Sequence, residues 1–203
     1  MTRCCPAFLL MIVCLCACTA GAPSTVYEPA RAESRNTFEA QKLNGMGVEK
    51  MEAQPDSAER YFKRALTEDL YFGPAHNNLG VLYLNKGMLY EAANEFEWAR
   101  KLMPGHPDPR MNLGLTLERA ARTDEARKAY ASALEVYAGH VPTLQAIARL
   151  NVERGVRDAE SERILKDIAL QGESEEWRDW ARGQLLRFTS APMATDSAPS
   201  GRR

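Results

Sequence analysis

Residues 73–106 read GPAHNNLGVLYLNKGMLYEAANEFEWARKLMPGH, and residues 107–140 read PDPRMNLGLTLERAARTDEARKAYASALEVYAGH. The two stretches align along their whole length without a gap. The matching pairs are Gly80 with Gly114, Ala92 with Ala126, Phe96 with Tyr130 and Ala99 with Ala133. A fixed period of this length is typical of repeat architectures, in which one supersecondary unit stacks on the next.

The shared residues resemble the tetratricopeptide repeat (TPR), whose W-x₂-L-G-x₂-Y…A-x₃-F…P pattern describes one helix-turn-helix unit. The first copy matches at Leu79-Gly80, Tyr83, Ala92, Phe96 and Pro104 and departs at His76, where the family has Trp. The second copy departs at Leu117 and Ala138. The resemblance implies an all-α solenoid built from stacked helix-turn-helix pairs.

Weaker copies flank this pair, so we expect a TPR domain over residues 34–189. It would hold about four repeats, at 39–72, 73–106, 107–140 and 141–171, followed by a capping helix at 174–189. The first repeat has Gly45-Met46 where Leu-Gly is expected, and the fourth has Ile147-Ala148 there.

Two further features support the fourth repeat and the capping helix. Gly155 falls on the same repeat position as Gly87, which is the turn glycine between the two helices of a unit. Trp177 and Trp180 are expected to cover the last groove, because a terminal repeat has no further neighbour.

The start of the chain has the composition of a targeting signal. Arg3 precedes an apolar run over residues 7–17, which is too short to span a bilayer and ends in small residues, as in a secretory signal peptide. Leu15-Cys16-Ala17-Cys18 resembles a bacterial lipobox. That resemblance implies a lipoprotein signal peptide at 1–17 and a mature N-terminus at Cys18, lipidated with acyl chains such as palmitate. The alternative is an ordinary secreted protein cut near Ala17 or Ala20.

The segments outside the repeats are predicted to lack a core. Residues 18–33 are small and contain proline, as expected of a flexible tether, and residues 190–203 are expected to be a disordered tail. Thr19, and not Asp, follows Cys18, which by the same resemblance favours the periplasmic face of the outer membrane. All five cysteines lie between Cys4 and Cys18, so no disulfide framework is expected in the folded part.

The composition and motifs argue against several functional classes. A net charge of −1 provides no basic surface for nucleic acid. His76, His106 and His140 are scattered and suggest no metal site. No nucleophile elbow, phosphate-binding loop, zinc signature or dinucleotide fingerprint is present. We therefore expect neither catalysis nor a cofactor.

By resemblance to the TPR family, the first helix of each repeat lines a concave groove that binds a peptide segment or helix. The implied groove residues are Asn77, Val81, Leu84, Asn85, Met111, Leu115, Glu118, Arg119 and Arg149. The apolar members would form the floor, Asn77, Asn85 and Gln145 would pair with a peptide backbone, and the arginines with acidic groups. The alternative is that the Met and Leu side chains pack onto neighbouring helices and leave no specific peptide site.

One TPR variant is excluded by its residues. The carboxylate clamp that holds chaperone C-termini requires lysine, asparagine and arginine at defined repeat positions. Asn77, Val81, Asp108, Pro142 and Ala146 occupy those positions here, so the clamp is absent.

A second candidate surface comes from differences between repeats. Tyr90 and Trp98 stand where the other repeats carry mostly polar residues, on the second helix, which faces outward in this family. Exposed aromatic residues suggest a contact surface. The alternative is that the N-terminal segment or the first helix folds back over them.

The sequence therefore predicts a non-catalytic protein-binding scaffold, anchored through lipid in the bacterial cell envelope, whose partner is a protein or peptide of that envelope. The alternative functions are an accessory or recruiting subunit for a cell-wall or protein-folding enzyme, and a lipoprotein of pilus or secretin assembly.

Overall fold

The computed structural model describes residues 35–190, and within that range the chain is helical throughout, with nine helices and no strand. The helices are α1 (Thr37–Lys50), α2 (Pro55–Glu68), α3 (Gly73–Asn85), α4 (Leu89–Leu102), α5 (Asp108–Arg119), α6 (Thr123–Val136), α7 (Val141–Glu153), α8 (Ala159–Gln171) and α9 (Glu175–Ser190). The predicted signal peptide, Cys18, the tether and residues 191–203 of the predicted tail lie outside the described residues.

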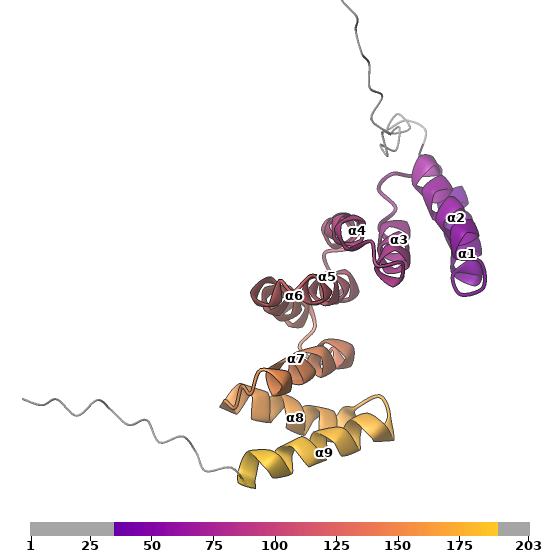
Figure 1. The fold of residues 1–203 in the computed structure, drawn as a ribbon. Coiled ribbons are helices and arrows are strands. Elements are labelled where there is room, and N and C mark those ends of the chain that lie inside the picture. The colour runs from indigo at the N-terminus through magenta and orange to yellow at the C-terminus, as the bar shows by residue number, and fades with distance from the viewer. Residues whose placement is uncertain (1–34, 191–203) are drawn as a thin grey trace, which may run out of the picture.

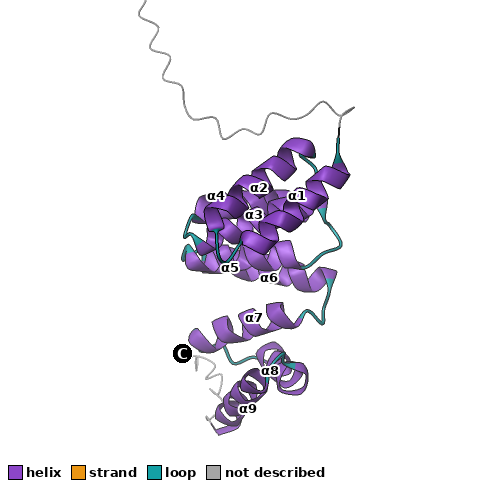
Figure 2. Ribbon diagram, turned by 90° about the vertical axis from the view of Figure 1, so that its right-hand side faces the viewer, coloured by secondary structure: helices purple, strands orange, loops and turns teal. Residues whose placement is uncertain are grey.

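Consecutive helices pair and the pairs stack into an arc (Figure 1). The odd-numbered helices α1, α3, α5 and α7 lie on the inner side of the arc, while α2, α4 and α6 lie on the outer side (Figure 1). The view in Figure 2 shows the same order from the side, with α7, α8 and α9 forming the last layers. The predicted all-α solenoid of helix pairs with a C-terminal capping helix is confirmed.

Proline and short polar side chains start several of the helices. Proline stands in the first turn of α2, α3, α5 and α7, where its missing N–H breaks no helical hydrogen bond. Asn36 and Asp158 cap α1 and α8, each accepting a hydrogen bond from a backbone N–H three residues later. These local signals explain why the helix starts recur at nearly the same place in each repeat.

The turn inside each of the three later helix pairs uses a left-handed residue at an equivalent position. Gly87, Ala121 and Gly155 occupy this position in successive pairs and have φ of 76°, 58° and 67°. At Gly87, its N–H bonds to the carbonyl of Leu84 and the next N–H to that of Tyr83, as in a Schellman motif. The same two bonds recur at Ala121. Ala121 therefore holds a conformation that a Cβ disfavours.

A glycine in the first helix of each of the first three pairs receives an aromatic ring from the second. A Cβ on Gly80 would lie 2.7 Å from Phe96 Cε1, and one on Gly114 would lie 2.5 Å from Tyr130. Real Cβ atoms do not approach so closely, so only glycine fits without a shift. The rings of Phe96 and Tyr130 are fully buried.

The first repeat makes the same contact one residue out of phase. Its aromatic residue is Phe62, as the spacing predicts, but the glycine beneath the ring is Gly47. Met46, which occupies the expected position, is partly exposed. The predicted alignment of Met46 with Gly80 is therefore wrong by one residue, because the α1–α2 connection lacks the left-handed turn of the later repeats.

Two hydrophobic clusters hold the solenoid together. The larger extends from Ala40 of α1 to Leu150 of α7. The smaller joins α7, α8 and α9 around Leu144, Ile164 and Ile168. Within residues 35–190, no helix has both the length and the apolar character needed to cross a bilayer.

The capping helix α9 covers the last groove with two indoles, as predicted. Trp177 and Trp180 pack against the smaller cluster with their ring centroids 5.2 Å apart, edge to face. Such an arrangement of rings is favoured over a face-to-face sandwich.

The glycine–aromatic contact can be tested with a matched pair of substitutions. Gly80→Leu should lower the free energy of unfolding by about 1–3 kcal/mol, because the added side chain must displace the Phe96 ring in a packed core. Gly45→Leu is the control, since a Cβ there meets no atom within 4 Å. Thermal and urea unfolding measure both. Equal stability of the two variants would show that the contact does not hold the helix pair.

The strained turn predicts a stabilising substitution. Ala121→Gly should raise the free energy of unfolding by up to about 1 kcal/mol, because glycine adopts positive φ without the Cβ penalty. Gly87→Ala should lower it by a similar amount. A decrease in the urea midpoint of Ala121→Gly would contradict this account of the turn.

Candidate functional site

Most of the predicted groove residues belong to α3, α5 and α7, the helices on the inner side of the arc (Figure 1). Asn77, Val81, Met111, Leu115, Glu118 and Arg149 are half-buried there, and Asn85 and Arg119 are exposed. Val81, Met111 and Leu115 pack with their inner parts against the larger core and leave the remainder accessible. The structure therefore brings these residues together on α3, α5 and α7, three neighbouring inner helices.

Asparagine side chains connect the inner helices to one another. Asn78 Nδ2 donates to Asn44 Oδ1 at 3.0 Å, which joins α3 to α1. Asn112 Nδ2 donates to Asn77 Oδ1 at 3.2 Å, which joins α5 to α3 in the same way. An asparagine amide can make more bonds than the one that each of these contacts uses. The row of amides therefore retains donors and acceptors for a bound chain.

Two inner-face residues were missed by sequence reasoning, Asn44 and Val48. The shift of one residue at Gly47 makes Asn44 the counterpart of Asn77 and Val48 the counterpart of Val81. Val48 is 49% exposed and extends the apolar row onto α1. The signal was present, because Asn44-x-x-Gly47-Val48 matches Asn77-x-x-Gly80-Val81 at a separation one shorter than the repeat period.

Glu118 lies at the centre of a polar network at the α5–α7 junction. Arg149 forms an ion pair with Glu118 Oε1 at 2.7 Å and a longer one with Glu153. Tyr130 Oη donates to Glu118 Oε2 at 2.8 Å. Burial and this bond to a carboxylate raise the pKa of Tyr130 well above its usual range, so the phenol stays protonated as a donor.

This network changes what the two arginines can do. Arg149 already compensates its charge with Glu118 and Glu153, so the predicted pairing of Arg149 with an acidic partner is not favoured. Arg119 is exposed and donates to the backbone oxygen of Leu84 at 3.1 Å, a neutral acceptor. Arg119 is therefore the better-placed cation for a carboxylate on a partner.

Two predicted contact residues are buried and cannot present their side chains. Leu84 is only 4% exposed and belongs to the larger core, so its assignment to the groove floor was wrong. Gln145 is likewise buried, although sequence reasoning placed it beside a peptide backbone. Both errors arise because the same repeat position is covered in one repeat and accessible in another, since Glu118 and Met111 of the third repeat, at the positions of Leu84 and Gln145, are only half-buried. The predicted alternative, packing onto a neighbouring helix, holds for Leu84.

Tyr90 and Trp98 differ in exposure on the outer helix α4. Tyr90 is 84% exposed, whereas Trp98 is 39% exposed and stacks on His76 with ring centroids 5.7 Å apart. His76 is buried and bonds to Glu95 and to the carbonyl of Leu70. Trp98 thus has a packing role over the start of α3, and Tyr90 alone of the two has the exposure of a contact residue.

Residues 35–190 contain no group of three or more His, Cys, Asp or Glu side chains arranged to hold a metal ion. The imidazole of His140 instead connects the starts of two inner helices. It pairs with Asp108 of α5 at 3.1 Å and bonds to Thr143 of α7 at 2.7 Å.

Comparison with known proteins identifies the fold. No protein-family model and no curated protein matches the chain. Among solved structures, it is similar to the first TPR of Spaghetti (RPAP3) bound to the HSP90 peptide SRMEEVD, with a TM-score of 0.57 and 15% identity over 60% of this chain and 98% of that one.

Two further structures show the same similarity. MamA matches with a TM-score of 0.55 and 17% identity, over 73% of this chain and 81% of that one. The APC/C hetero-tetramer Cut9-Hcn1 matches with a TM-score of 0.61 and 20% identity, over 74% of this chain and 30% of that one. The chain therefore has the TPR fold.

Proposed function

We propose that this chain is a non-catalytic protein-binding scaffold that holds a segment of another protein on its inner face. The observation that supports it most directly is that asparagine amides link α1, α3 and α5 side by side, while Val48, Val81 and Leu115 on the same helices remain partly accessible. Extended polypeptide presents regularly spaced backbone N–H and C=O groups that amides can bind, and apolar anchors that Val48 and Leu115 can receive.

The chemistry of the inner face also narrows the class of segment. Val48, Val81 and Leu115 offer shallow apolar contacts, and Arg119 supplies a cation beside them. A segment with one or two apolar anchors and a nearby acidic residue fits this arrangement. A TPR similar in fold, that of RPAP3, was solved with an acidic peptide, which supports this class of ligand. The missing clamp residues argue against a chaperone C-terminus as the natural one.

We further propose that Cys18 carries the lipid that anchors the scaffold to the bacterial envelope, on the periplasmic face of the outer membrane. The support is the lipobox-like Leu15-Cys16-Ala17-Cys18 and the absence of Asp after Cys18. Residues 18–33 would then separate the lipid from the first helix by a tether long enough to turn the inner face toward envelope proteins.

The inner face can be tested by placing charge on it without disturbing the core. Val48→Glu combined with Arg119→Glu should weaken capture of the partner on the order of tenfold or more. The glutamate at 48 would place a charge against the partner's apolar anchor, and the glutamate at 119 would reverse the charge of the exposed cation. Photo-crosslinking in envelopes, from a reactive amino acid at residue 48, identifies the captured protein. Quantitative co-purification then measures the loss.

The matched control is Tyr90→Glu, which adds a charge at an accessible site on the outer face. Circular dichroism should show that all variants keep their helix content. Capture that survives the double substitution but is lost in Tyr90→Glu would move the binding site to the outer face.

The anchor is tested by Cys18→Ser, which removes the thiol that would receive the lipid. The variant should no longer be labelled by a clickable palmitate analogue and should leave the detergent phase in Triton X-114 partitioning. A wild-type chain that partitions into the aqueous phase would favour the ordinary secreted protein over the lipoprotein.

A further inference from the structure

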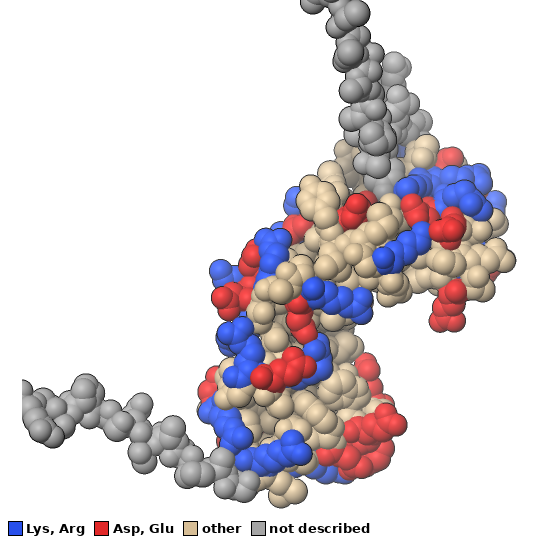
Figure 3. Space-filling view, viewed as in Figure 1, with Lys and Arg blue, Asp and Glu red and all other residues tan. Residues whose placement is uncertain are grey.

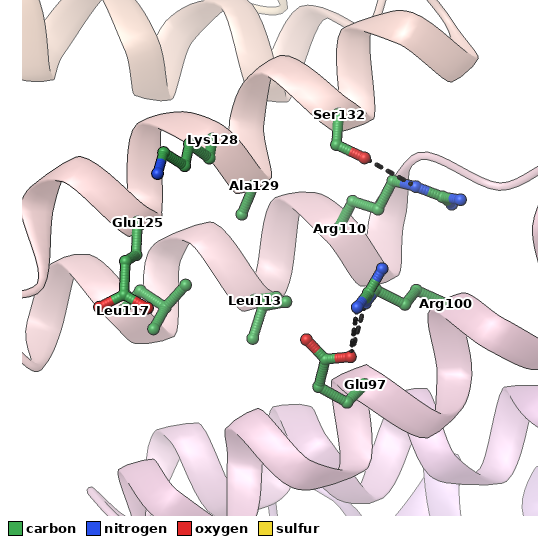
Figure 4. Close-up of a pocket in the computed structure, with 9 residues that line it drawn as sticks. All are labelled: Glu97, Arg100, Arg110, Leu113, Leu117, Glu125, Lys128, Ala129 and Ser132. Carbon is green, nitrogen blue, oxygen red and sulfur yellow. Dashed lines mark hydrogen bonds and ion pairs between the residues drawn. The ribbon is translucent and has the colours of Figure 1, made fainter.

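The outer surface carries a pocket between α4 and α6 that the inner-face function does not use. The pocket has a volume of about 310 Å³, and its floor is formed by Leu113 and Leu117 of α5 (Figure 4). This volume lies at the lower end of the roughly 300–1,000 Å³ usual for ligand pockets, so it suits one or two side chains and not a whole helix.

Comparison of the second and third repeats shows why the pocket is open. In the second repeat, Trp98 and Glu95 fill the equivalent place over α3, and the indole stacks on His76. The residues at the same positions of the third repeat are Ser132, Ala129 and Arg110. Replacing an indole by a hydroxymethyl group and a carboxyethyl group by a methyl removes most of the side-chain volume that would cover the floor.

The floor reflects this loss. Leu113 is 7% exposed, whereas its counterpart Leu79 is fully covered. Because the backbone on either side is regular helix, the opening comes from side-chain size and not from a distorted segment. Leu117, at 8%, is about as buried as its counterpart Tyr83, at 6%, so the difference at the base of the pocket is a narrow opening over Leu113.

The charges around the pocket are unbalanced. Glu97 is paired with Arg100, with atoms 2.6 Å apart, and Glu125 is paired with Arg122 at the same distance. Arg110 bonds to two neutral acceptors, Ser132 Oγ at 3.2 Å and the carbonyl of His106 at 3.1 Å (Figure 4 shows the first).

Between residues 35 and 190, no carboxylate lies within ion-pair distance of Arg110 or of Lys128. The hydrogen bond from Arg122 lowers the pKa of Glu125, and the charge of Lys128 adds a smaller contribution in the same direction. Two cations at the rim of an apolar floor are therefore left without a direct counter-charge. An ionised carboxylate accepts paired hydrogen bonds from a guanidinium group, and such charge-assisted bonds are stronger than those to neutral acceptors.

The wider surface around the pocket carries charges of both signs. Lys and Arg recur along the left-hand, outer edge of the arc in Figure 3, interspersed with Asp and Glu, whereas acidic side chains gather at the opposite side of the α8–α9 end. The attraction for an acidic ligand is therefore local to the rim of the pocket, at Arg110 and Lys128.

We propose that the pocket between α4 and α6 binds an acidic segment of a partner protein in which one apolar side chain is flanked by Glu or Asp. The apolar side chain lies on Leu113 and Leu117, and the flanking carboxylates pair with Arg110 and Lys128. This outer site is independent of the inner face, so one scaffold molecule holds two segments at once.

The test uses the purified full chain and two fluorescein-labelled peptides, one with a leucine between pairs of glutamates and one with glutamine at each glutamate. Fluorescence anisotropy should show that the glutamate peptide binds at least tenfold more tightly, and that this preference falls as salt is raised from about 0.01 to 0.15 M, because screening weakens exposed charge pairs.

Two substitutions localise the binding. Ser132→Trp should abolish it by refilling the pocket as Trp98 fills the preceding one. Lys128→Glu should weaken it about tenfold by reversing a rim charge. The matched control Lys101→Glu reverses a charge on α4 that faces Trp98, outside the pocket, and should bind as the wild type does. Because the inner face is proposed to accept a segment of similar chemistry, the same comparisons are repeated in a chain that carries Val48→Glu with Arg119→Glu, in which binding by the pocket should persist.

Equal affinity for the two peptides would overturn the assignment to an acidic ligand, and unchanged binding by both Ser132→Trp and Lys128→Glu would overturn the assignment to this pocket. Sedimentation velocity adds a further outcome. Concentration-dependent self-association that disappears in Ser132→Trp would make a second copy of this chain the occupant, in place of a different protein. Loss of binding in the chain with Val48→Glu and Arg119→Glu, and in neither pocket variant, would assign the peptide to the inner face.

Discussion

The structure depends on a ring lying directly against a helix backbone, which occurs where Phe62, Phe96 and Tyr130 cover a glycine in the preceding helix. Without a side chain at the glycine, the two helices of a pair approach closely, and the ring fills the space that remains between them. This close contact uses one side of each helix for packing within the pair. A second side packs against the next repeat, and the sides that remain form the inner and outer surfaces of the solenoid.

The inner and outer surfaces differ in how many of their polar side chains form hydrogen bonds or ion pairs within the chain. On the inner helices, bonds between neighbouring repeats use part of the polar groups, as in the ion pair of Arg149 with Glu118. Those bonds hold the inner helices in register, and they leave the asparagine row and Arg119 for a ligand. On the outer face, Arg110 and Lys128 have no carboxylate of the described residues within ion-pair distance, because Glu125 pairs with Arg122 and Ala129 stands where the second repeat has Glu95.

The repeat period was sufficient to predict the helix pairs, the turn positions at Gly87 and Gly155 and the rings at Phe96 and Tyr130, because a period records contacts that every repeat makes. It failed at Met46, where a different turn shifted the register by one residue. It also failed at Leu84, because the same repeat position is accessible or covered depending on the size of its neighbours. The outer pocket could not be predicted from motifs, because it results from the small side chains of Ser132 and Ala129, which leave open the space that larger side chains fill in the second repeat.

The hydrophobic interior is divided into two clusters, one extending from α1 to α7 and the other joining α7 to α9. Ile147 of α7 packs against both clusters, so a displacement of one cluster reaches the other through this side chain. Stacked repeats contact only their neighbours, so bending concentrates where one cluster ends and the next begins. A ligand long enough to touch both Leu115 and Arg149 would span that joint from the inside. Binding such a ligand would stiffen the arc, so that tension on a captured protein is carried along the whole solenoid.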